Sequence, residues 1–373
     1  MDPTPSEGKL RIILNQNDFA ERRSLDDNAI NFFKSCKMIN EFRDGLQVYV
    51  GLLISVISLR HKIILLDEPE AFLHPPKART LGRYMTTLAA DREGSLIVST
   101  HSPDFLLGCL DESTKITISR LTYNGNNGTT HRLDSDEIKT LTTDPLLRSS
   151  ETISALFHSS SIISEADKDR VFYAEINRRL SDKKYGIDDV QFLNSQGKHT
   201  IHRIFGPLRK IGIPTAAIYD LDVIKYEELK KEKTTLWRKI MECAHVPGAE
   251  QISLDSQRQN LQRILVQRKN EFLDPFKKQG ISILTGNEKT AAKKFLKEAT
   301  KYGIFIVPTG DVESWSQNLL NQSFEKGIWL VNVLEALEDK HPELDGTEIK
   351  EFFKGIKTWI ENPNRLGVSK HEE

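Results

Sequence analysis

Two polar clusters follow apolar runs in the first third of the chain. Asp67 and Glu68 come directly after the apolar run 63–66, and His101 stands shortly after the run 96–98. Short apolar runs of this kind are typical of strands in a parallel sheet that is buried on both faces. Open α/β sheets bind ligands just beyond the carboxyl ends of such strands. An acidic pair that holds Mg²⁺ and orients a water, beside a histidine, therefore predicts nucleotide hydrolysis.

A second acidic group is spread over the later part of the chain. Glu165 and Asp169 stand four residues apart where a strand is predicted to pass into a helix, so both carboxylates can face one point. Asp220 and Asp222 end another apolar run, and Glu313 follows the last predicted strand. Carboxylates gathered at strand ends repel one another unless cations neutralise them, and hard oxygen donors select Mg²⁺ or Mn²⁺. Two such ions can stabilise both oxygens of a phosphodiester displacement, so this group predicts a metal-dependent hydrolase.

Alternating helices and strands are expected to position the first cluster. A polar helix is predicted over 28–40, and from 41 to about 109 the order is helix, strand, helix, strand. The crossover helix 77–90 would join the two strands that carry the polar ends. The segment 46–59 is the longest apolar stretch, and it is too short to cross a bilayer, so it is interpreted as a buried helix.

The second acidic group is expected to lie in another alternating unit. A hairpin over 115–133 and a linker over the Ser-, Thr- and Asp-rich segment 134–151 would separate the two parts. The later unit is predicted to contain the strands 162–163, 190–193, 214–219 and 304–307 and the helices 167–180, 200–211 and 289–302. A charged, mostly helical insertion over 226–279 is expected to break at Pro247, and the chain ends in a helical tail.

Composition narrows the class of protein. The 373 residues carry a formal net charge of −1, with 28% charged and 38% hydrophobic residues, which is typical of a soluble globular chain of two or three domains. No global basic field indicates nucleic acid, so any such binding must be local. Cys36, Cys109 and Cys243 are too scattered for a disulfide framework or a zinc site. Without a secretory segment, a cytoplasmic location and no membrane partner are expected.

The first cluster resembles a known ATPase motif. Residues 62–75 read KIILLDEPEAFLHP and residues 95–102 read SLIVSTHS. These segments resemble the Walker B strand and switch histidine of ATP-binding-cassette (ABC) ATPases, in the form used by DNA-repair and overcoming-lysogenization-defect (OLD) proteins. The resemblance implies that Asp67 binds Mg²⁺, that Glu68 polarises the attacking water and that His101 senses the γ-phosphate.

The segment 41–47 stands where the ABC signature motif would lie. Gly45 and Gln47 match that motif, and Arg43 occupies the position of a serine that contacts the nucleotide of a partner subunit. An arginine can meet the same phosphate charge. The resemblance therefore adds Arg43 and Gly45 to the residues expected to bind nucleotide, although an ordinary surface role for Arg43 stays open.

The second acidic group resembles a Toprim domain over roughly 160–320. Residues 165–173 follow the Toprim opening motif, with Ala166 where glycine is usual, and residues 219–223 follow its D-x-D strand end. Residues 310–313 resemble the late acidic motif of OLD-type Toprim domains. The resemblance implies that Glu165 is a general base or metal ligand and that Asp220 and Asp222 bind metal. Asp169 and Glu313 would complete the metal shell.

One required ATPase motif is missing. A complete ABC ATPase needs a loop of the form G-x-x-x-x-G-K-[ST] to cradle phosphates, and no such loop occurs in this sequence. ATP is therefore expected as a cofactor only together with the missing Walker A part. We expect either self-association or an amino-terminal ATPase partner, and a remnant that no longer binds nucleotide by itself remains an alternative.

The predicted fold class is α/β, with two parts. A partial ABC-type ATPase lobe with parallel strands (1–140) precedes a Toprim, Rossmann-like domain (155–320) with a helical insertion (226–279) and a helical tail (321–373). The predicted function is a Mg²⁺- or Mn²⁺-dependent endonuclease or nickase on DNA, regulated by nucleotide. The resemblance to OLD-type and Gabija-type nucleases implies a role in anti-phage defence. The alternatives are an ATPase subunit or a non-catalytic regulatory fragment completed by a partner.

Overall fold

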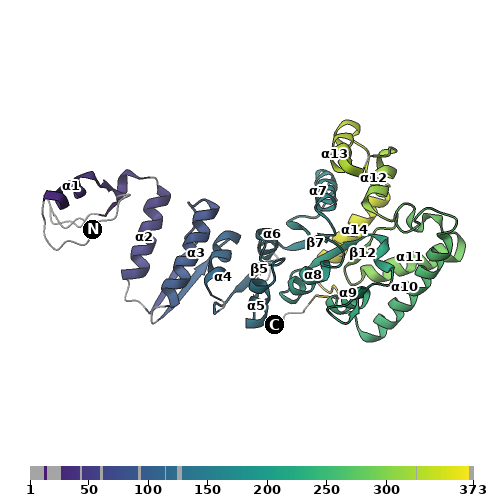
Figure 1. Ribbon diagram of the computed structural model, residues 1–373, viewed down its shortest axis with the longest axis horizontal. Helices are drawn as coiled ribbons and strands as arrows, with labels where there is room; N and C mark the ends of the chain where they lie inside the picture. Colours follow the sequence, from purple (N-terminus) through teal and green to yellow (C-terminus); the bar gives the residue numbers. More distant parts are fainter. Residues whose placement is uncertain are drawn as a thin grey trace. The chain divides into compact units, whose positions relative to one another are not determined.

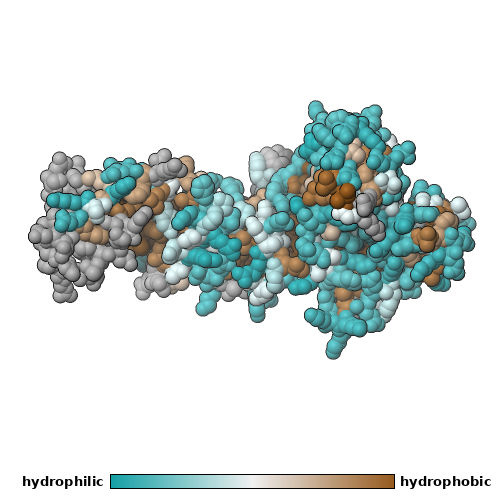
Figure 2. Space-filling model, turned by 45° about the horizontal axis from the view of Figure 1, so that its top comes forward, coloured by the Kyte–Doolittle hydropathy of each residue, from teal (hydrophilic) through white to brown (hydrophobic). Residues whose placement is uncertain are grey.

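The chain forms two compact units, Met1–Ile116 and Thr117–Glu373 (Figure 1). The computed structural model describes residues 12–14, 27–42, 44–58, 62–90, 94–113, 115–123, 128–324 and 326–368. Hydrophilic residues cover most of the second unit on the face shown in Figure 2. Among the described residues, no helix has the length and apolar character that crossing a membrane requires.

The first unit contains a two-stranded parallel sheet with helices. Its elements are β1 (Ile13–Leu14), α1 (Asp27–Ser35), β2 (Lys37–Met38), α2 (Asp44–Ser58), β3 (Ile63–Asp67), α3 (Pro75–Ala90), β4 (Ser95–Ser99) and α4 (Pro103–Glu112). Strands β3 and β4 pair in parallel, with Leu65 opposite Ile97 and Asp67 opposite Ser99. The predicted order of helix, strand, helix, strand is confirmed. The predicted helix over 28–40 is shorter, since α1 ends at Ser35.

Among the described residues, helices cover only one face of this sheet. Val56, Ala78, Leu81, Met85 and Phe105 form a buried cluster that packs against one side of β3 and β4. On the other side Ile63, Leu65 and Ile97 are exposed by 63%, 71% and 56%. The expectation that these strands are buried on both faces is therefore wrong for the described part of the chain. Strands that are apolar on both faces leave a bare apolar surface when helices cover only one of them.

The second unit is built on a four-stranded parallel sheet. Its strand order is β12 (Ile304–Ile306), β9 (Thr215–Tyr219), β7 (Ser160–Ser164) and β8 (Val190–Asn194). Every residue of β7, β9 and β12 is buried, as expected of central parallel strands. Helices α7 (Asp167–Asp182), α8 (Ile201–Lys210) and α11 (Gly286–Thr300) connect or flank them. All the strands predicted for this unit are present.

The carboxyl-terminal helices belong to the core of this unit. Helices α12 (Val312–Leu320), α13 (Trp329–Lys340) and α14 (Glu348–Glu361) follow β12. Trp329, Val333 and Phe353 share one buried apolar cluster with Ile162 and Phe172. The segment 321–373, predicted as a helical tail, does contain helices, and these are amphipathic and bury their apolar faces against the sheet domain.

The predicted linker is also folded. Residues 134–151 contain α5 (Ser135–Thr143) and the start of α6 (Ser150–Ser154), and Leu133, Ile138 and Leu141 are buried. The preceding hairpin, β5 (Ser119–Tyr123) with β6 (Gly128–Arg132), packs in the second unit. Arg120 donates hydrogen bonds to the carbonyl oxygens of Leu156 and His158 at 2.9 and 2.7 Å. The units consequently divide at 116, earlier than the predicted boundary near 140.

The insertion between β9 and β12 is mainly helical, as predicted. It contains the short strands β10 (Glu228–Leu229) and β11 (Thr234–Thr235), then α9 (Leu236–Cys243) and α10 (Gly248–Arg268). Pro247 stands at the N-cap of α10, in agreement with the predicted break. Helices α10 and α11 lie side by side (Figure 1).

Candidate functional site

Two strand ends of the second unit bring Glu165 and Asp220 together. Glu165 follows the fully buried strand β7, and Asp220 follows its neighbour β9. Because the strands are parallel, both carboxyl ends meet at the same edge of the sheet. The backbone N–H of Asp220 donates to the Glu165 Oε1 at 3.1 Å. The loop after β8 closes on the same point, since the N–H of Gly197 donates to the Glu165 carbonyl oxygen at 2.6 Å.

The first turn of α7 holds the third carboxylate. Asp169 is 6% exposed, and its Oδ2 accepts the backbone N–H of Ala166 at 3.0 Å. Ala166 is the N-cap of α7, so an acidic side chain three positions later fits the positive end of the helix. Glu165 and Asp169 therefore lie on the two sides of the junction between β7 and α7, where the sequence predicts a strand to pass into a helix.

The turn after β12 supplies two more carboxylates. Gly310 has φ of 111°, and a Cβ there would lie 2.6 Å from the carbonyl oxygen of Lys277, so this turn requires glycine. Asp311 caps α12, and its Oδ1 accepts the N–H of Ser314 at 2.8 Å. Glu313 is the second residue of α12 and forms an ion pair with Lys168.

These side chains surround one cavity of about 480 Å³. Its lining residues are Glu165, Ala166, Lys168, Asp169, Gln196, Gly197, Asp220, Lys277, Asp311 and Glu313. Five carboxylates and two lysines therefore share one hollow at the carboxyl edge of the sheet. Four of the five predicted metal-binding residues lie in it.

Asp222 is the exception among the predicted metal-binding residues. It lies in a 3₁₀ helix (Leu221–Ile224) just past Asp220, is 8% exposed and does not line the cavity. The Lys198 Nζ lies 3.0 Å from Asp222 Oδ1 and 2.8 Å from Glu227 Oε1. The D-x-D pair is thus divided, with Asp220 facing the cavity and Asp222 held by a lysine.

The electrostatics of the cavity favour a bound cation. Burial raises the pKa of Glu165 to about 7, and the neighbouring Asp222 and Asp169 add to that rise. Burial likewise raises the pKa of Asp169 to about 6, and it raises the pKa of Asp220 well above its ordinary value. The pKa of Asp311 is also raised, mainly by burial. Partly buried carboxylates that resist ionisation together are stabilised by a proton or by a metal ion.

The oxygen donors fit a hard divalent cation in kind, although they are not fully assembled. Carboxylate oxygens are the ligands that Mg²⁺ and Mn²⁺ prefer. Within the part of the chain that the structure describes, no three Asp, Glu, His or Cys side chains converge closely enough to hold an ion. Binding would therefore require rotation of the side chains that line the cavity.

Sequence reasoning missed Asp311, Lys168 and Lys277. Asp311 lies inside the segment 310–313 that was singled out, and the spacing Asp311-x-x-Ser314 is the signal of a helix N-cap. No local signal could reveal Lys277, because the insertion brings it to the cavity from a distant part of the sequence.

The polar cluster of the first unit is partly assembled. The Glu68 N–H donates to the Ser99 carbonyl oxygen at 3.0 Å, and Glu68 has φ of 42°. Its Oε1 lies 3.3 Å from the Nε2 of His101, whose side chain is 86% exposed. Asp67 accepts a hydrogen bond from the hydroxyl of Ser99. The expected neighbours therefore lie together at the carboxyl ends of β3 and β4.

Gly45, which was also expected to bind nucleotide, is not part of this group. Gly45 lies in α2, where a Cβ would come within 2.7 Å of the Phe72 carbonyl oxygen, so a close backbone approach accounts for the glycine. Arg43 lies outside the described residues.

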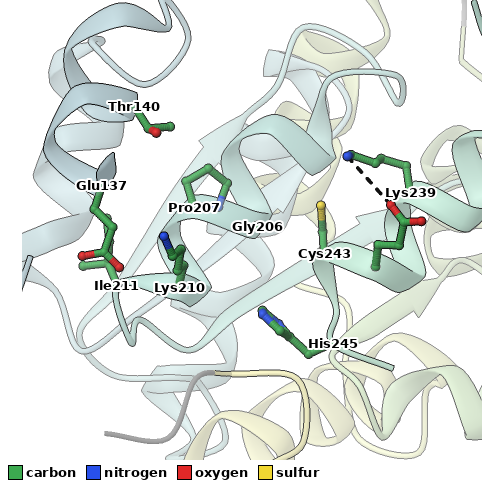
Figure 3. A pocket seen from close by; sticks show the side chains of 10 residues that line it. Glu137, Thr140, Gly206, Pro207, Lys210, Ile211, Lys239, Cys243 and His245 are labelled. Carbon is green, nitrogen blue, oxygen red and sulfur yellow. Dashed lines mark ion pairs between the residues drawn. The ribbon is translucent and has the colours of Figure 1, made fainter. Parts of the chain in front are cut away.

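A second cavity, of about 340 Å³, lies among α5, α8 and α9 (Figure 3). Two of its lysines already have carboxylate partners: Lys239 lies 3.8 Å from Glu242, and Lys210 lies 3.6 Å from Asp134. Burial raises the pKa of the Cys243 thiol to about 11, which leaves it protonated and unreactive at neutral pH. No predicted site residue lines this cavity.

Comparisons with known proteins match both units. Residues 39–107 match the family model of an AAA domain described as a putative AbiEii toxin of a type IV toxin–antitoxin system. Residues 156–222 match the family model of the Toprim domain of overcoming-lysogenization-defect-like proteins. No match was found among the curated proteins. An ATPase-type domain followed by a Toprim domain is the architecture of the OLD family, and this chain has that architecture.

Proposed function

We propose that this chain is a nuclease that cleaves DNA with Mg²⁺ or Mn²⁺ in the cavity of its Toprim domain. The observation that carries the proposal is the gathering of five carboxylates in one cavity at the carboxyl edge of the sheet. The Toprim match spans Glu165, Asp169 and Asp220, three of the residues that line it. The OLD-type architecture supports a nuclease, and the choice of DNA, the metal and a role in anti-phage defence belong to the proposal.

The residues of the cavity would serve as metal ligands, as a general base and as lysines that receive the substrate. Asp169, Asp220, Asp311 and Glu313 would hold the metal ions, which supply charge neutralisation at a phosphodiester when bound. Glu165 has a pKa of about 7, near the operating pH at which a carboxylate serves best as a general base. It can accept a proton from a water that attacks the phosphorus.

Lysines of the cavity can receive the substrate. The Lys277 side chain lines the cavity and has no ion pair within the described part of the chain. An ammonium group placed there can pair with a phosphate oxygen of the nucleic acid. Lys168 is held by Glu313 and can exchange that carboxylate for a phosphate when metal binds Glu313.

Cleavage by single-residue variants tests the proposal. With MgCl₂ present, Asp220→Asn and Asp311→Asn should each lower the cleavage rate of supercoiled DNA by about 10² or more, the scale of losing a catalytic group. Asp182→Asn is the control, because Asp182 is 69% exposed at the far end of α7. Wild-type rates in both cavity variants would rule out this site.

Nucleotide control is proposed through the first unit. Glu68 and His101 lie 3.3 Å apart, as the polarising carboxylate and sensor of an ATPase would. The exposed Ile63, Leu65 and Ile97 give the remainder of an ATPase domain an apolar surface to cover. We therefore propose that an amino-terminal ATPase part with the Gly-rich loop completes this unit, in the same polypeptide or as a partner.

The second candidate function is a non-catalytic regulator that occupies the ATPase interface of another protein. The exposed apolar face of β3 and β4 favours it, since such a face can bind a partner without any chemistry. The two functions differ in their need for the cavity. A regulator with Asp220→Asn would still act on its partner protein, whereas a nuclease with the same substitution would no longer cleave DNA.

A further inference from the structure

The segment 269–301 is basic although the chain as a whole is not. It carries eight lysines and four acidic residues, whereas the formal net charge of the complete chain is −1. The segment runs from the end of α10 past Lys277, which lines the carboxylate cavity, into α11. Positive charge is therefore gathered along one stretch of chain that passes the cavity at Lys277.

The lysines of α11 share the solvent side of that helix. Lys289, Lys293 and Lys297 are spaced four residues apart, and Lys294 lies beside them. Lys293, Lys294 and Lys297 are exposed, and Lys289 is half-buried. The buried positions of the helix lie on the opposite side: Ala292, Phe295 and Ala299. We refer to Lys289, Lys293, Lys294 and Lys297 as the α11 stripe.

The acidic residues of α11 do not neutralise the stripe. Glu288 pairs with Arg268 at 3.3 Å, and Glu298 pairs with Lys301 at 2.6 Å. None of the four stripe lysines has an ion pair with another described residue. Like charges four residues apart destabilise a helix slightly. An unpaired stripe of this kind therefore has a stability cost that an anionic partner would remove.

The stripe belongs to the part of the fold that builds the cavity. Helix α11 packs against β12, the strand that leads directly to Asp311 and Glu313. It also contacts α14, where the buried Glu348 lies close enough to Lys293 and Lys289 for their charges to act on it. The segment that leads from Lys277 into α11 is tied to the cavity edge, because the N–H of Ile281 donates to the carbonyl oxygen of Pro308 at 2.9 Å.

We propose that the α11 stripe binds the phosphate backbone of the DNA strand outside the bond that is cleaved. The proposal rests on the proposed nuclease function and adds to it a surface that holds the substrate. From Lys289 to Lys297 the helix advances by about 12 Å, which is the length of roughly three to four nucleotide steps along B-DNA. The contacts are to phosphates, so the stripe would position DNA without reading its sequence.

Equilibrium binding to a fluorescent DNA duplex, measured by anisotropy in CaCl₂, tests the proposal. The variant Lys293→Gln/Lys294→Gln/Lys297→Gln should bind at least about 10-fold more weakly at 0.1 M salt, roughly the scale of losing several phosphate contacts. The slope of log affinity against log salt should fall in magnitude by about 2 to 3. The matched control is Lys183→Gln/Lys184→Gln/Lys354→Gln, which removes the same charge from exposed sites elsewhere and should bind as wild type does.

The outcomes separate this proposal from the nuclease proposal. If wild type cleaves DNA and the stripe variant keeps wild-type affinity and salt slope, the stripe is not the binding surface. If wild type binds DNA through the stripe and does not cleave it, the surface is supported and the nuclease assignment fails. Equal losses in the stripe and control variants would show only a dependence on net charge and would overturn the proposal. All six lysine changes lie at exposed positions, so the thermal stability of both variants should stay close to that of wild type.

Discussion

The carboxylate cavity should make the metal-free protein less stable as the pH rises, and Glu165→Gln should remove part of that effect. In the folded protein the pKa of Glu165 is about 7 instead of 4.5, mainly because the carboxyl group is buried. Between these values the folded state binds the proton and the unfolded state does not. Stability must then fall as the pH rises through this window, and the loss is complete above about pH 8.

The size of the effect follows from the shift. A rise of about 2.5 pKa units corresponds to about 3 kcal/mol of lost stability above the window. For a unit of this size, 3 kcal/mol corresponds to a change in Tm of roughly 6 to 12 °C. The glutamine of Glu165→Gln can still accept the N–H of Asp220, so the substitution removes the charge and leaves that hydrogen bond available.

The assay is differential scanning calorimetry in EDTA from pH 5 to pH 8. Relative to wild type, Glu165→Gln should gain little stability at pH 5 and about 3 kcal/mol at pH 8. Glu335→Gln is the control, because Glu335 is an exposed residue of α13 without an ion pair to another described residue. A difference in stability between wild type and Glu165→Gln that stays constant across this pH range would refute the conclusion that burial in the cavity raises the pKa of Glu165.

Further predictions concern the core and the first unit. Arg209 is fully buried between Phe205 and Trp359 and donates to three carbonyl oxygens, so Arg209→Met should destabilise the second unit by about 3 kcal/mol or more, measured by urea unfolding. An unchanged midpoint would contradict this. The isolated chain, which lacks the Gly-rich loop, should bind ATP·Mg²⁺ more weakly than micromolar by calorimetry. With the missing ATPase part supplied, Glu68→Gln should slow ATP hydrolysis by about 10² or more, while DNA cleavage persists with an altered response to ATP. An identical response to ATP in both proteins would show that the two units are not coupled.

The hydrophobic pattern revealed most of the second unit because its strands β7, β9 and β12 are buried along their full length. Apolar runs such as 215–219 have no other stable place than a central parallel strand. The segment 134–151 was misread because Ser, Thr and Asp suit loops and helix N-caps equally well. In the structure Asp134 caps α5 and forms a capping box with Glu137, so the same residues begin a helix.

Residues of the site were predictable where an acidic side chain stands directly at the end or the start of a strand or helix. Glu165, Asp169 and Asp220 each stand at the end or start of a regular element, so the sequence pattern places them at one edge of the sheet. The orientation of Asp222 away from the cavity, and the presence of Lys277 in it, were not predictable in this way. The orientation of Asp222 depends on Lys198, and the position of Lys277 depends on how the insertion packs on Gly310. Such tertiary contacts leave no periodic signal in the sequence.

The central claim is that the carboxylates of the cavity hold the metal ion on which DNA cleavage depends. The most direct measurement is the rate of cleavage of supercoiled DNA as MnCl₂ is titrated into wild type and into Glu165→Gln/Asp220→Asn. Wild type should be inactive in EDTA and should reach a plateau with increasing Mn²⁺, whereas the double variant should stay inactive at every concentration. Cleavage by wild type without metal, or the same Mn²⁺ dependence in both proteins, would contradict the claim.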